Sequence, residues 1–230
     1  MDIITQIDQA KLSFAASRKA LVEAHGTWVT AKDARLTAFS KCMGVLNSTS
    51  LGLIYIRRHL ILPDWWSQFR ASDGAPPSLT EAQEYVNGFD AFIKIGFIQS
   101  VFSAIESSFR SIVRVMDPSA CSGGNAEFKS VYSFMLGRLK LQKWISLLDL
   151  LRCIRNTIHN NGIYFHRSGK DELVIYNGTS YNFVIGAQVG FLYWEFLIEL
   201  MADVEKMLLE VATNPALDSI PNIEDLSIID

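Results

Sequence analysis

The sequence predicts an all-α protein, a helical bundle with one small β-hairpin, preceded by an N-terminal helical extension. Apolar residues recur at steps of three and four along most of the chain, and this spacing places them on one face of an α-helix. Between residues 163 and 184 the period gives way to short β-prone runs. The chain has 230 residues, 49% of them hydrophobic, so it can bury a sizeable core.

Two helices are expected in the N-terminal region, residues 1–62. The apolar spacing predicts an amphipathic helix over about 5–23. A second helical region follows over about 32–62, with an interruption expected near 47–52, where Ser, Thr and Gly accumulate. Pro63 closes this region because proline cannot continue a helix.

Residues 63–78 are the clearest connector in the chain, since they hold three prolines together with aspartate and glycine. The connector also contains the pair Trp65-Trp66. We expect these rings to pack against the bundle, and contact with an interface or a ligand is the alternative.

A helical bundle is expected over residues 79–213. Ser78 or Thr80, followed by acidic and amide side chains, predicts the start of a helix of roughly 30 residues. Two further helices are predicted around 127–136 and from about 142 to 160.

Three β-prone runs follow, and Asn177-Gly178 between the last two predicts the turn of a β-hairpin. A last amphipathic helix is expected from about 187 to 212. The acidic, proline-broken residues 214–230 are expected to form a loose tail. The three runs are Ile163–Phe165, Leu173–Tyr176 and Tyr181–Val184.

Charge and cysteine content exclude several classes of protein. With 21 basic and 24 acidic residues, the net charge of -3 cannot attract nucleic acid to the molecule as a whole, so any polyanion site must be local. Cys42, Cys121 and Cys153 lie far apart, which argues against a disulfide framework and a thiolate zinc site. A reducing compartment and no cofactor are expected.

No targeting or membrane segment is expected. The first residues are acidic and polar, whereas a secretory signal would have a basic end followed by an apolar run. Charged residues such as Lys94 and Glu195 interrupt the most apolar stretches, so no run of ~20 apolar residues is available to span a membrane. We therefore expect a cytoplasmic protein.

One polar cluster marks the helix predicted over 142–160. Arg152, Arg155, Asn156 and His159 follow one another at steps of three, one and three, which places them on one stripe. The opposite side is apolar, so this stripe is expected to be an accessible edge. A histidine with a pKa of about 6.5 can exchange protons near neutral pH, and an arginine beside it can hold a phosphate.

This arrangement resembles the HEPN superfamily, in which an arginine is followed after four to six residues by a histidine, late in a helical bundle. Arg152 to His159 fits this spacing, whereas Arg155-Asn156 has the arginine-polar pairing of many members, so either arginine can be the motif residue. The run FIQSVFSAIESSFRSIVRVM is similar to the long helix that packs against the motif helix in that family, with Glu106 in reach of an arginine.

The resemblance covers about residues 79–213 and implies metal-independent RNA cleavage in a toxin or phage-defence setting. His159 would be the acid or base, Arg152 or Arg155 would hold the phosphate, and Asn156 would orient either group. About 10 Å of helix rise separate Arg152 from His159, too far for both to grip one phosphate. The resemblance therefore implies a homodimer through the motif helix, and it implies RNA and an antitoxin or other protein as partners.

Local charge also favours RNA. Residues 137–170 hold seven basic side chains against one acidic side chain, a balance of +6 within a chain of net charge -3. We expect Arg138, Lys140 and Lys143 to bind RNA. A solvated helix face is the competing interpretation of this basic run.

The rival function is a non-catalytic helical module that dimerises or binds a protein or RNA partner. In that case the two arginines and His159 form a solvated face, or an arginine pairs with Glu106 to hold two helices together. His166 lies seven residues after His159 but beyond a glycine, so a two-histidine metal site is not expected and no metal is predicted.

Overall fold

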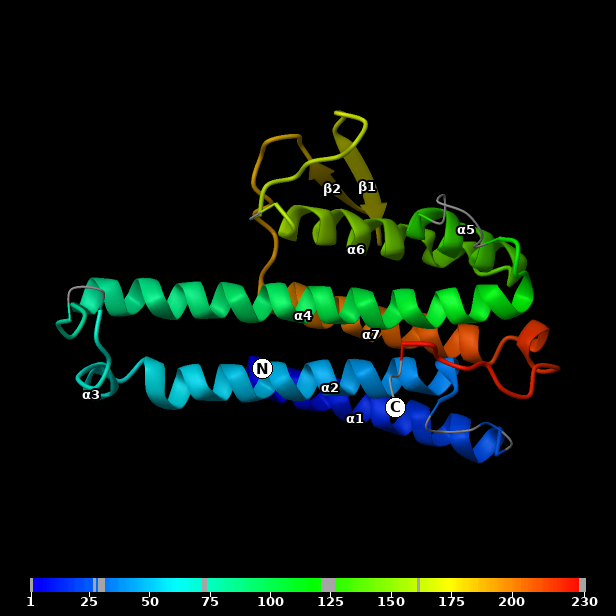
Figure 1. Cartoon of the computed structure of the whole chain (residues 1–230), viewed down its shortest axis with the longest axis horizontal. Coiled ribbons are helices and arrows are strands. Elements are labelled where there is room, and N and C mark those ends of the chain that lie inside the picture. The colour runs from blue at the N-terminus through cyan, green and yellow to red at the C-terminus, as the bar shows by residue number, and fades with distance from the viewer. Residues whose placement is uncertain are drawn as a thin grey trace.

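The protein forms a helical bundle with one two-stranded antiparallel sheet, as predicted for the fold class (Figure 1). The computed structural model describes residues 2–26, 28, 32–71, 74–120, 127–160 and 162–227. The helices are α1 (Ile3–Ala24), α2 (Ala34–Tyr55), α3 (Pro63–Trp66), α4 (Leu79–Met116), α5 (Phe128–Arg138), α6 (Ile145–Ile158) and α7 (Trp194–Ala212). The strands are β1 (Glu172–Tyr176) and β2 (Thr179–Phe183), and short helical turns cover Ile56–Leu60, Gln142–Trp144 and Pro215–Leu217.

The helices are arranged around α4. Helices α2 and α4 run antiparallel side by side, α1 and α7 lie behind them, and α5, α6 and the hairpin lie along the other edge of α4 (Figure 1). One hydrophobic core joins these elements, and its buried residues extend from Ile7 in α1 to Ile223 near the C-terminus. The two N-terminal helices therefore share a core with residues 79–213.

Helix α2 is continuous, so the interruption expected near 47–52 is wrong. Thr49 and Ser50 are buried, and a Cβ atom at Gly52 would lie 2.7 Å from Cδ1 of Ile93 on α4. The small residues that suggested a break instead allow α2 to lie close to α4. The irregular part of the helix comes later, in the π-helical turn Ile56–Leu60.

Gly52→Val is expected to lower the free energy of unfolding by about 1–3 kcal/mol, because added methyl groups must displace the Ile93 side chain. A Cβ atom at Gly44, on the same helix, meets nothing within 4 Å, so Gly44→Val is the matched control. Its effect is expected to stay within about 0.5 kcal/mol. Urea unfolding of both variants measures the difference, and equal effects would contradict close packing at Gly52.

The start of α4 has the predicted cap. The hydroxyl of Ser78 accepts a hydrogen bond from the backbone N–H of Glu81, and the Glu81 carboxylate accepts one from the N–H of Ser78 at 2.8 Å. This reciprocal pair satisfies two N–H groups that have no partner within the helix. The helix then runs for 38 residues.

The connector 63–78 contains α3, whose first residue is Pro63. The Trp66 ring is buried, and its indole N–H donates a hydrogen bond to the carbonyl of Leu60 at 2.8 Å. Together with Ala82 and Val86 these residues form a small second core. The predicted packing of the tryptophan pair against the bundle is confirmed for Trp66.

The predicted β-hairpin is confirmed. Tyr176 pairs with Thr179 across a turn in which Asn177 and Gly178 have φ angles of 47° and 75°. Positive φ at both positions is the geometry of a type I′ turn, which explains the Asn-Gly pair. The run Ile163–Phe165 does not form a strand of this sheet. Where the structure describes it, Ile163 forms an isolated bridge with Gln188.

The last helix begins at Trp194 rather than near residue 187. The backbone of the preceding residues pairs with the chain that follows α6. Tyr164 donates its N–H to the carbonyl of Ala187 at 3.0 Å, and its own carbonyl accepts the N–H of Gly186 at 3.0 Å. These bonds and a turn at residues 185–186 use backbone groups that a helix starting near residue 187 would need, so the helical spacing of the apolar residues was a misleading signal.

The expectation of a loose tail is wrong for residues 214–227. Leu217 and Ile223 are fully buried, and the carbonyl of Ile223 accepts the N–H of Ala34 at 2.7 Å. Fully buried Arg35 donates to the carbonyls of Leu217 and Ile220, and Asp225 forms a 2.6 Å salt bridge with Lys41. The acidic segment is therefore fixed to the first turns of α2.

Helix α4 contains an apolar window that is long enough, by length and composition alone, to cross a bilayer. One third of that window is buried within the protein. Core helices of soluble proteins pass the same test, so the absence of a membrane span stays a prediction.

Candidate functional site

A cavity of about 820 Å³ lies at the C-terminal end of α6. Residues of α4 and α6, the start of α5 and the segment 165–172 form its wall. The wall includes all four residues of the predicted polar stripe, Arg152, Arg155, Asn156 and His159. The structure thus brings the stripe to one hollow surface, although the four side chains differ in what they contact.

His159 is the first residue after α6 and is exposed to solvent. Its backbone N–H still bonds to the carbonyl of Arg155 at 3.2 Å, so the end of the helix fixes its position. On the side of α4, the amide nitrogen of Gln99 lies 3.0 Å from Nε2 of the imidazole. Partial burial and the neighbouring charge of Arg155 lower the pKa of His159 below its ordinary value, which favours the neutral ring.

Arg152 does not lie on an accessible edge, and this part of the prediction is wrong. Its guanidinium is buried in a short ion pair with Glu172 of β1 and lies 3.6 Å from Asp149. Glu172 also accepts a hydrogen bond from the hydroxyl of Tyr164 at 2.9 Å. The side chain of Arg152 therefore ties the hairpin to α6.

Arg155 has a different environment. It is half-buried, its Cζ lies 5.4 Å from the centre of the Phe102 ring, and its Nε is buried without a hydrogen-bond partner. Among the described residues, no carboxylate forms a salt bridge with it. Within the described ranges, Arg155 is thus the arginine of the stripe that lines the cavity without a salt bridge.

Asn156 is half-buried beside Arg155. Its backbone carbonyl accepts a hydrogen bond from the Asn160 amide at 2.8 Å, which caps the last turn of α6.

The expected ion pair between Glu106 and a motif arginine is not formed. Glu106 lines the cavity, but its carboxylate pairs with Arg110 one turn further along α4, at 2.6 Å. The carboxylate that Arg152 contacts most closely belongs to Glu172 instead. The i, i+4 spacing of Glu106 and Arg110 is the local signal that predicts the observed pair.

Arg138, Lys140 and Lys143 are not part of the cavity wall. They belong to the end of α5 and the turn before α6, whereas the cavity lies where α6 ends. Lys143 is also paired with Glu210 at 2.7 Å.

Other residues supply positive charge to the cavity, and the sequence did not mark them as a site. Lys129 comes from α5, and Arg167 and Lys170 come from the segment after α6. His166 lies in the same wall. Within the described ranges, no three His, Cys, Asp or Glu side chains are grouped so as to hold a metal ion.

Comparison of the chain with known protein families, curated proteins and solved structures found no match.

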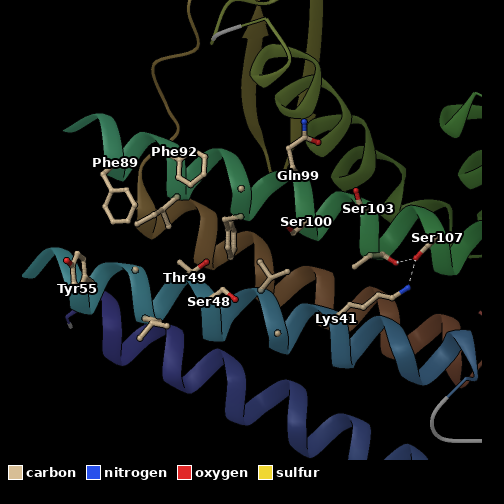
Figure 2. A pocket seen from close by; sticks show the side chains of 18 of the residues that line it. Lys41, Ser48, Thr49, Tyr55, Phe89, Phe92, Gln99, Ser100, Ser103 and Ser107 are labelled. Atoms are coloured by element: carbon tan, nitrogen blue, oxygen red, sulfur yellow. Dashed lines mark hydrogen bonds between the residues drawn. The ribbon is translucent and has the colours of Figure 1, made fainter. Parts of the chain in front are cut away.

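A second and larger cavity, about 1150 Å³, lies between α2 and α4 (Figure 2). Small residues recur at steps of four along both helices, and their short side chains leave space between the two helices. Among the described lining residues Lys41 alone is charged, and it bonds to Ser107 at 3.0 Å as well as to Asp225. The recurring small residues are Gly44, Ser48 and Gly52 on α2 and Gly96, Ser100 and Ala104 on α4.

Large apolar side chains stand beside this second cavity. Leu51 is 70% exposed and Phe92 is 68% exposed. Gln99 contributes to the wall, but its amide points toward α6 and meets His159 there (Figure 2). The two cavities therefore lie on different sides of α4.

Proposed function

We propose that the chain is a metal-independent endoribonuclease of HEPN type, acting in the cytoplasm in a toxin or phage-defence setting. The observation that carries the proposal is the joint presence of Arg155, Asn156 and the exposed His159 in one cavity wall. The guanidinium of Arg155, which forms no salt bridge within the described part of the chain and whose Nε is buried without a hydrogen-bond partner there, supplies the charge that a phosphate would neutralise. Resemblance to HEPN proteins supplies the expectation that this charge serves RNA cleavage.

In the proposed reaction, the 2′ oxygen of RNA attacks the adjacent phosphorus. His159 takes the 2′ proton, the bond from the 2′ oxygen to phosphorus forms, and the bond from phosphorus to the 5′ oxygen breaks. The products are a 2′,3′-cyclic phosphate and a 5′-hydroxyl. Arg155 lies one helical turn before His159, about 6 Å of rise away, so it can hold the phosphate oxygens while charge builds on them.

Arg155 is the motif arginine in this proposal, because Arg152 is engaged by Glu172. With Arg155 in place of Arg152, the helix rise between the arginine and His159 falls from about 10 Å to about 6 Å. The larger distance was the reason for invoking a partner subunit. A homodimer through α6 stays part of the proposal as a route to a second arginine and histidine. An antitoxin or other partner protein is likewise a proposal.

Incubation of the purified chain with mixed RNAs in EDTA tests the function. We expect cleavage, with 2′,3′-cyclic phosphate ends detected by mass spectrometry of the fragments. A folded protein that leaves structured and unstructured RNAs intact, alone and with cell extract RNA, would overturn the proposal.

The second candidate function is a non-catalytic module that associates with a second copy of itself, and the α2/α4 cavity favours it. Exposed Leu51 and Phe92 lie beside a row of small residues. In a dimer with a twofold axis, these two side chains of each copy would pack against the small residues of the other copy. The charge of Lys41 is already neutralised by Asp225, which suits an apolar interface.

Sedimentation measures this association. Phe92→Asp is expected to give monomers, while Leu12→Asp on α1, where the leucine is 71% exposed, is the control that keeps the dimer. A monomeric wild type, or a dimer that tolerates Phe92→Asp, would overturn this candidate.

A further inference from the structure

RNA cleavage by the proposed route requires a proton donor as well as a base. When the bond from phosphorus to the 5′ oxygen breaks, that oxygen must gain a proton, because an alkoxide is a poor leaving group. His159 acts as the base that receives the 2′ proton, so it is not the donor in the same step. A second group with an exchangeable proton must therefore face the same cavity.

His166 is placed to meet this need. It belongs to the segment after α6, yet it lines the cavity that contains His159. Its ring lies nearly parallel to that of buried Tyr164, with 13° between the planes and 6.5 Å between the centres. The Tyr164 hydroxyl is in turn bonded to Glu172, so the Tyr164 ring near His166 is held by the carboxylate that also pairs with Arg152.

The Nδ1 atom of His166 is engaged by Ser168. The Ser168 backbone N–H donates to Nδ1 at 3.2 Å, and the Ser168 hydroxyl lies 2.7 Å from the same atom. The backbone N–H can donate to Nδ1 only while the ring is neutral. In the protonated ring Nδ1 carries a proton, which it can donate to the Ser168 hydroxyl. Both contacts use the same edge of the ring, which leaves Nε2 as the nitrogen that can meet a ligand.

The charged residues that share the cavity wall with His166 come from its own segment and from α4, α5, α6 and β1. Arg152 of α6 is paired with Glu172 of β1, Lys129 of α5 pairs with Asp149 at 3.4 Å, and Arg155 of α6 adds positive charge. Arg167 and Lys170 are exposed neighbours on its own segment, and Arg167 pairs weakly with Glu127 before α5 at 3.4 Å. Asp171 accepts the N–H of Ile185 at 2.8 Å. Glu106 of α4 is paired with Arg110.

We propose that His166 of the same chain is the general acid that protonates the leaving 5′ oxygen, so that one subunit holds both members of the acid–base pair. This inference rests on the proposed function. Nε2 of His166 gives its proton to the 5′ oxygen as the bond from phosphorus breaks, and His159 keeps the 2′ proton until solvent removes it. The substrate is a single-stranded RNA segment, since Phe165 stands exposed beside His166 and offers a face for an unpaired base.

Two substrates separate an acid from a structural residue. RNA has a leaving alkoxide that needs a proton, whereas a uridine 3′-(4-nitrophenyl phosphate) releases a phenolate that does not. His166→Ala is expected to cleave RNA about 10²–10⁴-fold more slowly than wild type and the activated ester less than about tenfold more slowly. His159→Ala is expected to lose both reactions, and His59→Ala, outside the cavity, neither.

Each outcome has a distinct meaning. If wild type cleaves both substrates, an equal loss of both activities in His166→Ala would overturn the acid role. Unchanged RNA cleavage in His166→Ala would overturn it as well. A wild-type chain that cleaves neither substrate would instead overturn the proposed function itself. Circular dichroism and thermal unfolding of His166→Ala establish that the variant retains the wild-type fold in either comparison.

Discussion

His159→Ala is expected to slow RNA cleavage by about 10²–10⁴-fold, because it removes the group proposed to take the 2′ proton. The imidazole is exposed and follows the last turn of α6, so its loss removes little packing. The melting temperature should therefore stay within about 2 °C of wild type. Initial rates on a fluorescent oligoribonucleotide in EDTA measure the effect.

Arg155→Lys is the companion variant for this experiment. Lysine keeps the charge beside His159 but loses the planar fork that contacts two phosphate oxygens together. We expect an intermediate loss, about tenfold or more, with a smaller change in the pKa of His159 than in Arg155→Met. Full activity in His159→Ala would show that the cavity does not act through this imidazole.

The helical framework was predictable because its signals are local. Helix α6 has apolar residues on one side at regular spacing, and the Ser78 cap and the Asn177-Gly178 turn are each specified by a few neighbouring residues. Such patterns depend on backbone geometry within one or two turns. They place His159 at the end of a helix without any information about the rest of the chain.

The exposure of the polar stripe was not predictable in the same way. Spacing places Arg152 and Arg155 on similar sides of α6, but the hairpin covers one of them. Glu172 is a strand residue 20 positions after Arg152, beyond the reach of helical spacing, so no local pattern relates the two. His166 reaches the cavity for the same reason, since the segment after α6 folds back over the end of that helix.

The C-terminal segment was predicted wrongly because its composition was given more weight than its apolar spacing. Its acidic composition and prolines suggested a solvated tail, yet Leu217, Ile220 and Ile223 recur at steps of three. Two of these are fully buried, and Ile220 packs against the core. The spacing of these apolar residues predicts their burial better than the average composition of the segment does.

Arg152→Met is expected to lower the free energy of unfolding by about 3 kcal/mol or more at neutral pH, because it leaves Glu172 without the cation that neutralises it. The two side chains are 11% and 22% exposed, so solvent compensates the remaining carboxylate only in part. The melting temperature should fall by about 10 °C. Arg155→Met, which breaks no salt bridge among the described residues, is the matched control and should cost about 1 kcal/mol or less.

The pH dependence of that loss identifies the carboxylate responsible. Burial alone would raise the pKa of Glu172, but Arg152 and the Tyr164 hydroxyl hold it below its ordinary value. The wild-type pair therefore contributes stability above the unfolded pKa of about 4.3, and this contribution is lost as pH falls through the lower folded value. In Arg152→Met burial acts without Arg152 to oppose it, and protonation of Glu172 at acid pH relieves the penalty. The difference between wild type and Arg152→Met should thus be largest near pH 7 and shrink below about pH 4, whereas a difference independent of pH would mean that Arg152 acts through packing of its aliphatic stem.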